Sequence, residues 1–64
     1  MAVKLEKDTY LEYSPEEDFY YIEIKDPQNW RISEQAWKTA QEAIEAHRTE
    51  SVEFVSIAET GDLS

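Results

Sequence analysis

The chain has 64 residues, and 15 acidic residues against six Lys and Arg give it a formal net charge of −9 at pH 7. Affinity for phosphates comes from Lys and Arg, so this balance argues against direct binding to nucleic acid or to an anionic membrane, and it favours a basic protein as partner. The alternative interpretation is that the acids only keep a small protein soluble. The length predicts a single domain over residues 1–64, and the absence of cysteine excludes disulfides and thiolate zinc sites.

The N-terminal stretch alternates between apolar and polar residues and carries acids, so we do not expect a signal peptide. No apolar run approaches the ~20 residues of a membrane span, and we expect a cytoplasmic protein. The alternation predicts a half-buried strand over about residues 3–13, although Lys7 falls on its apolar side.

Residues 14–18, Ser-Pro-Glu-Glu-Asp, predict a tight turn with its acids in water. A calcium loop would need ligands at alternate positions and a glycine, which this turn lacks, so we expect no metal here. Residues 19–25, FYYIEIK, are aromatic and β-branched and predict the best strand of the chain. The short turn requires the two strands to form an antiparallel hairpin.

Pro27 cannot donate to a strand ladder, so the second strand is expected to end at about Asp26. Trp30 is expected to close the end of the core, and Ile32 to pack on the first turn of a helix. That helix is predicted over about residues 34–48 with Ser33 as its N-cap. Its apolar stripe, at spacings of three and four, contains Trp37, Ala40, Ala43, Ile44 and His47.

Residues 52–58 predict a third strand with a mixed pattern, which fits either two covered faces or a bulge, and residues 59–64 predict a frayed tail. The predicted fold class is α+β: a small β-β-α-β domain with a three-stranded sheet and one helix packed on one face. A returning strand parallel to the second would lie beside the first, in the order 2-1-3, by a right-handed crossover. An edge-to-edge dimer is the competing arrangement. The expected core consists of Leu5, Leu11, Tyr20, Ile22, Ile24, Trp37, Ala40, Ile44, Val52 and Phe54.

The sheet face away from the helix is the candidate interaction surface, because nothing else in the predicted fold covers it. Its aromatic residues would be ringed by carboxylates, and tyrosine often anchors protein interfaces. The competing interpretation is that these aromatics only pair across strands. A sharper hypothesis is a row of strand carboxylates at Glu6, Asp8 and Glu12, about 6.6 to 6.8 Å apart, that mimics phosphates and continues into the turn. The candidate partner-binding residues are Glu6, Asp8, Tyr10, Glu12, Glu16, Glu17, Asp18, Tyr21, Glu23 and Glu53.

We expect no enzyme and no cofactor. His47 lacks a nucleophile or an orienting carboxylate that the sequence can assign, so a capping or boundary role is favoured. The pair Glu16-Glu17 indicates a solvated turn and not a glycosidase site, and one glycine cannot build a phosphate-binding loop.

In size, charge and layout the chain resembles the small acidic proteins that phages make against host nucleases and CRISPR effectors. This resemblance implies an anti-defence inhibitor that occupies a basic nucleic-acid-binding site by charge mimicry. The alternative function is an accessory or regulatory subunit, or an antitoxin-like partner, that dimerises through its sheet. Salt dependence separates the two, because exposed charge pairs are screened over about 8 to 10 Å and an apolar interface is not.

Overall fold

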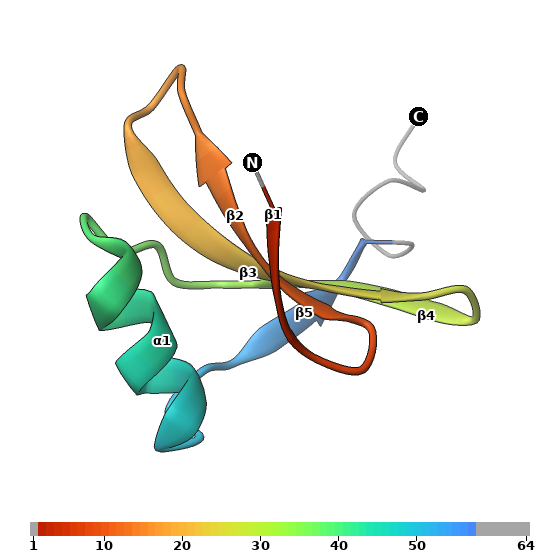
Figure 1. The fold of residues 1–64 in the computed structure, drawn as a ribbon. Coiled ribbons are helices and arrows are strands. Elements are labelled where there is room, and N and C mark those ends of the chain that lie inside the picture. Colours follow the sequence, from red (N-terminus) through yellow and green to blue (C-terminus); the bar gives the residue numbers. More distant parts are fainter. Residues whose placement is uncertain (1, 58–64) are drawn as a thin grey trace.

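The computed structural model describes residues 2–57, which form an antiparallel sheet and one helix (Figure 1). The elements in chain order are β1 (Ala2–Glu6), β2 (Thr9–Ser14), β3 (Phe19–Asp26), β4 (Asn29–Ser33), α1 (Ala40–Arg48) and β5 (Phe54–Ser56). The sheet has five strands in the order β1-β2-β3-β4-β5, and each pairs antiparallel with its neighbour. The α+β class with an antiparallel sheet and one helix is therefore confirmed, and the prediction of three strands is wrong.

The stretch predicted as one strand over residues 3–13 is two strands joined by a turn at Lys7 and Asp8. Asp8 has a positive φ of 63°, a conformation that Asp tolerates better than most residues. The register between β1 and β2 shifts between Lys4 and Glu6, so β1 carries a bulge there. An alternating pattern does not show where a chain reverses direction, and Lys7 on the apolar side was the only sign of the break.

The predicted hairpin of residues 19–25 with the first strand is confirmed as β3 paired with β2. The stretch after Pro27, for which the sequence predicted no element, is the strand β4. Pro27 and Gln28 form the turn to β4, and the Gln28 N–H donates to Asp26 Oδ1 at 3.0 Å. Pro27 lies in the turn, where it needs no ladder partner, so the chain can rejoin the sheet directly after it.

The third predicted strand is shorter than residues 52–58 and lies elsewhere. β5 covers Phe54–Ser56 and pairs antiparallel with β4, at the opposite edge from β1. The order 2-1-3 is wrong because β4, which the sequence did not indicate, lies between β3 and β5. The predicted tail at residues 59–64, and Ala58 of the predicted strand, lie outside the described residues.

The helix begins at Ala40 and not at Glu34, and its N-cap is Thr39, whose hydroxyl accepts the Glu42 N–H at 3.1 Å. Ser33, the predicted N-cap, instead links the strands and the crossover. It is buried, and its Oγ accepts the Ile22 N–H at 3.1 Å. Its hydroxyl donates to the Gln35 carbonyl at 2.8 Å. Between Ser33 and Thr39 the chain forms a crossover segment, residues 34–38, that runs from the sheet to the helix (Figure 1).

The core lies between α1 and the face of the sheet formed by β2 and β3. Ile22 is 0% exposed, Leu11 is 4% exposed and Ala43 is 0% exposed. Partly buried apolar side chains pack against these three: Leu5, Tyr20, Trp37, Ala40, Val52 and Phe54. Eight of the ten predicted core residues therefore belong to this cluster, namely two of its three buried members and these six.

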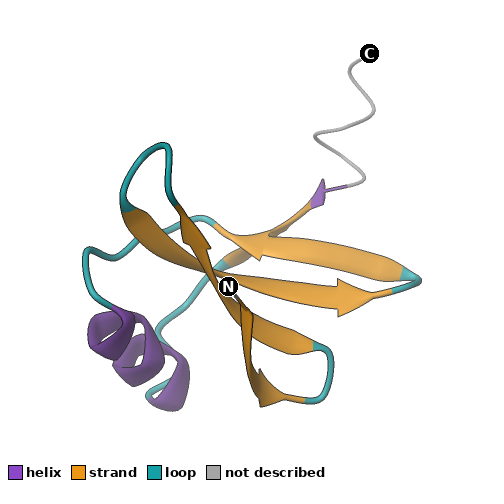
Figure 2. Cartoon of the chain, turned by 45° about the horizontal axis from the view of Figure 1, so that its top comes forward, coloured by secondary structure: helices purple, strands orange, loops and turns teal. Residues whose placement is uncertain are grey.

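The other two predicted core residues lie outside the cluster. Ile44 is 41% exposed and borders a surface groove beside Leu5 and Val52, whereas Ala43, the preceding residue of α1, is the one that packs against the sheet. Ile24 is only half-buried, since the β3–β4 hairpin extends beyond the helix (Figure 2).

Candidate functional site

The sheet face opposite α1 is open. Directly paired residues share a face, and Leu11 pairs with Ile22 on the helix side, so the alternate residues point away from the helix. One row of the open face crosses all five strands through Lys4, Tyr10, Glu23, Ile32 and Val55. The neighbouring pairs on this face are Glu12 with Tyr21, Ser14 with Phe19, and Lys25 with Trp30.

Trp30 is the most exposed aromatic side chain of the open face. Its exposed fraction is 44%, whereas Tyr10, Tyr21 and Phe19 are half-buried among their neighbours. Ile32 and Val55, both half-buried, continue the apolar surface towards β5. The open face is thus mainly aromatic and aliphatic, with an exposed indole near the tip of the β3–β4 hairpin.

The two carboxylates of the open face, Glu12 and Glu23, are each bound to a neighbouring side chain. Lys25 Nζ lies 3.0 Å from Glu12 Oε2 and 4.9 Å from the centre of the Tyr10 ring. The hydrogen bond to Glu12 raises the pKa of the Lys25 ammonium. The Trp30 Nε1–H donates to Glu23 Oε2. Glu12 and Glu23 therefore hold neighbouring side chains of the open face in place, and their charges are less available to attract a partner.

The predicted acidic row on one strand face is wrong. The bulge in β1 pairs Glu6 with Thr9 on the helix side, where Glu6 Oε2 lies 3.3 Å from His47 Nε2. Asp8 lies in the turn, and only Glu12 of the three points to the open face. The row failed because a single extra residue in a strand moves the following side chain to the other face.

The acidic turn between β2 and β3 divides its side chains between the two faces. Asp18, with a φ of 61°, accepts a hydrogen bond from the Tyr13 hydroxyl at 2.7 Å, and Tyr13 is on the helix side. This hydrogen bond is the main reason why the pKa of Tyr13 is raised. Glu17 instead borders a groove of the open face and lies 3.4 Å from Ser14 Oγ, while Glu16 is exposed.

Glu53 precedes β5 and is exposed, and its backbone joins the crossover segment. Its N–H donates to Gln35 Oε1 at 3.1 Å, and its carbonyl accepts the Glu34 N–H at 2.8 Å. Glu53 was predicted on the sheet face away from the helix, whereas it lies just before β5 and outside the strands. Trp30 was predicted at the end of the core and Ile32 against the helix, and it was missed that both belong to β4 on the open face. An aromatic and a β-branched residue at spacing two after a proline turn are the signals that could have identified β4.

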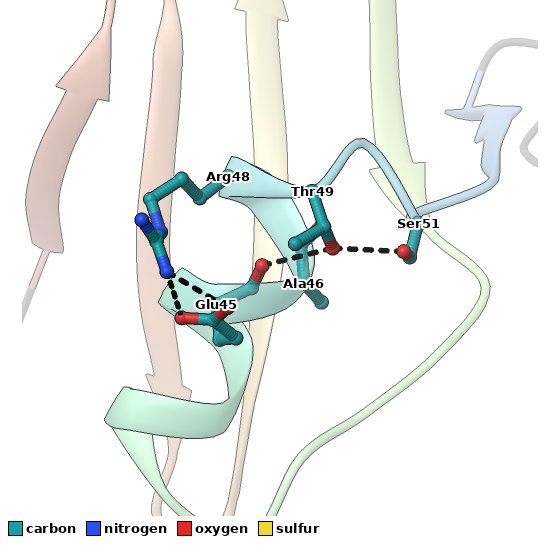
Figure 3. Close-up of polar contacts among 5 residues, drawn as sticks. All are labelled: Glu45, Ala46, Arg48, Thr49 and Ser51. Carbon is teal, nitrogen blue, oxygen red and sulfur yellow. Dashed lines mark hydrogen bonds and ion pairs between the residues drawn. The ribbon is translucent and has the colours of Figure 1, made fainter.

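The C-terminal end of α1 is held by local polar contacts (Figure 3). Arg48 Nη2 lies 2.8 and 2.9 Å from the two carboxylate oxygens of Glu45, and the Thr49 hydroxyl donates to the Glu45 carbonyl at 3.0 Å. The C-cap is Thr49, so His47 joins the helix to β1 through Glu6 and does not itself cap the helix.

In the part of the chain that the structure describes, no group of three or more His, Asp or Glu side chains could hold a metal ion. Within residues 2–57 no helix has the length and apolar character that crossing a membrane requires. Comparisons with models of known families, with curated proteins and with solved structures found no match to this chain.

Proposed function

We propose that this protein is a non-enzymatic binding protein that engages a basic protein through its open sheet face. The observation that carries the proposal is the row of aromatic and aliphatic side chains that α1 leaves uncovered, with Trp30 44% exposed. Aromatic side chains are enriched at the energetic centres of interfaces, since they bury much area at little entropic cost. The net charge of −9 selects a partner of opposite charge.

The specific role that we propose is inhibition, in the cytoplasm, of a nucleic-acid enzyme such as a host nuclease or a CRISPR effector. A protein that binds phosphates must present Lys and Arg in its groove, and a small, strongly acidic protein can occupy that groove in place of nucleic acid. The steering charge would come from acids around the open face, such as Glu16, Glu17 and Glu34, because Glu12 and Glu23 are already bound within it.

The second candidate is an accessory or antitoxin-like subunit that dimerises through the same face. The bound Glu12–Lys25 pair and an exposed indole favour it, because they leave the centre of the face with little net charge. Two chains of charge −9 repel one another, however, so self-association should strengthen as salt is added. Binding to a basic partner should weaken under the same change.

The test is binding kinetics with the protein that a tagged chain retains from its native cell. Trp30→Ala or Tyr21→Ala should raise the dissociation rate by about 30-fold, the equivalent of about 2 kcal/mol at an interface centre. Reversing the charge of Glu16 and Glu17 should slow association and flatten its salt dependence. Ile44→Ala is the matched control, since it removes a partly exposed apolar side chain from the helix side.

If both aromatic variants bind like the parent and like Ile44→Ala, the open face is not the interface. Sedimentation of the isolated chain at low and high salt tests the second candidate. A dimer that strengthens with salt and dissociates on Trp30→Ala favours the accessory-subunit role, and a monomer under both conditions rules it out.

A further inference from the structure

A groove of about 310 Å³ opens on the same face of the sheet, where β4 separates from β3. The backbone ladder between β3 and β4 covers only residues 23–26 and 29–32, and beyond it Ile22 is bound to β4 through the Ser33 side chain alone. The crossover segment forms the far wall of the groove. The residues around it are Ser14, Glu17, Phe19, Tyr21, Ile32 and residues 33–36.

Hydrogen bonds fix this wall in the free protein. Tyr20 and Trp37 exchange two backbone hydrogen bonds of 2.7 and 2.9 Å, which tie the end of the crossover segment to β3. The Gln35 side chain spans to the linker before β5, with its Nε2 donating to the Ser51 carbonyl at 3.0 Å and its Oε1 accepting from the Glu53 N–H. Because the wall is held at both ends, a ligand would not need to order it, and this reduces the entropic cost of binding.

The chemistry of the groove is an aromatic floor between acids. Phe19, Tyr21 and Ile32 supply the apolar surface, and Glu17 and Glu34 are the acids that border it. Burial raises the pKa of the Tyr21 hydroxyl, and the charges of Glu23 and Glu12 add to this rise while Lys25 opposes it. A volume of about 310 Å³ is at the small end of the roughly 300–1,000 Å³ of ligand pockets, which suits one long side chain.

We propose that this groove holds the side chain of an arginine of the basic partner, an inference that rests on the function proposed above. A guanidinium is planar, so it can stack on an aromatic ring while its N–H groups donate to carboxylates beside it. An apolar side chain in the same place would take the two carboxylates out of water without any compensating charge. An anionic side chain would be repelled by them.

The groove can be tested without the partner, by following backbone amide signals as Nα-acetyl-arginine amide is added. Saturable shifts are expected at Phe19, Tyr21, Ile32 and Ala36. The probe Nα-acetyl-citrulline amide has nearly the same shape and no charge, and it should give no saturable shifts. Neutralising both acids, in the double variant E17Q/E34Q, should raise the dissociation constant about fivefold or more.

The matched control is E42Q/E50Q, which removes the same charge from exposed positions on and just after α1. It should change the dissociation constant less than about twofold, because screening weakens charges beyond about 8 to 10 Å. Equal weakening by both double variants, or shifts spread over α1 as well as the groove, would show non-specific attraction to an acidic protein. Saturable binding of citrulline amide, or no saturable binding of arginine amide, would also overturn the proposal.

Binding to the native partner separates the failure of this inference from the failure of the proposed function. Trp30 is on the open face but outside the groove. If Trp30→Ala weakens partner binding and E17Q/E34Q does not, the open face is the interface and the arginine site is wrong. If arginine amide binds the groove while Trp30→Ala leaves partner binding unchanged, the groove has the proposed chemistry and the proposed interface is wrong.

Discussion

Ile22 and Ile44 allow the same substitution to be compared at a buried and at an open position. Ile22 is 0% exposed and packs with Leu11 and Ala43, whereas Ile44 is 41% exposed on the helix. Ile22→Ala should lower the free energy of unfolding by about 2 to 5 kcal/mol, because it leaves a cavity that the surrounding sheet cannot fill. Ile44→Ala should lower it by only about 1 kcal/mol, because its site opens to solvent and little apolar area is lost.

The size of the chain makes this difference easy to detect. At about 0.05 to 0.15 kcal/mol per residue, a domain of this length has roughly 3 to 10 kcal/mol of stability in total. Ile22→Ala can therefore unfold the protein, and Ile22→Val, with an expected loss of about 0.5 to 1.5 kcal/mol, is the milder variant. Urea unfolding followed by circular dichroism gives both values, and with a slope near 1 kcal/mol per M the Ile22→Val midpoint should fall by about 1 M.

Equal decreases in the free energy of unfolding for Ile22→Ala and Ile44→Ala would contradict this account. They would mean that α1 turns Ile44 into the sheet, as the helical pattern of the sequence predicts when the helix begins at Glu34. The orientation of α1 on the sheet, and with it the core formed by Leu11, Ile22 and Ala43, would then need to be reassigned.

Ser33→Ala should lower the free energy of unfolding by about 1 to 3 kcal/mol, because the buried Ile22 N–H loses its acceptor; unchanged urea unfolding would contradict this. Thr39→Ala should lower it by about 0.5 to 2 kcal/mol through loss of the N-cap, with weakened helical amide shifts from Ala40 onward. Alkaline pH should destabilise the fold. The pKa values of Tyr13 and Lys25 are raised from 10.0 and 10.5, so the folded state holds both protons more tightly. This stabilisation is fully present below the pKa values of the unfolded chain, and it is lost as the pH rises through the pKa values of the folded state. Urea midpoints measured across this range should fall, and Tyr13→Phe should make the fall smaller.

The parts of the fold that local pattern determines were predictable from the sequence. The alternation in residues 19–25 assigned Tyr21 and Phe19 to one face and Ile22 to the core, and the acidic turn predicted the antiparallel hairpin. These features depend on the period of a strand and on the length of a turn, which are both local properties.

The parts that depend on distant contacts were not predictable. Ser33 and Thr39 are both good N-cap residues, and the contacts that assign Ser33 to the sheet, its pairing with Phe54 and the bond from Ile22, come from other strands. The helical spacing of Trp37 before Ala40 is overridden by its backbone pairing with Tyr20. β4 shows only one period-two pair, Trp30 and Ile32, and because this pair was not interpreted as a strand, neither residue was assigned to the open face.

The candidate site likewise contains some parts that local sequence pattern predicts and others that it does not. Tyr10, Phe19 and Tyr21 followed from alternation and Trp30 did not, whereas the predicted acidic row depended on an unbroken strand and failed at the bulge before Glu6. The groove beside the crossover segment depends on Gln35, whose bonds reach 16 and 18 residues along the chain. No pattern in neighbouring residues encodes a contact of that range.

The two tryptophans offer the most direct measurement of the central claim, that the open sheet face binds a partner. Trp30 is 44% exposed on that face, whereas Trp37 is partly buried against the core. In a Trp37→Phe variant all tryptophan fluorescence of this chain comes from Trp30. This chain is labelled with a tryptophan analogue that is excited at longer wavelength, so that the tryptophans of the partner are not excited. Partner binding should shift the Trp30 emission to the blue and protect it from acrylamide, while the Trp30→Phe variant, which reports Trp37, should change little. Unchanged emission and quenching of Trp30 in the saturated complex would contradict the claim.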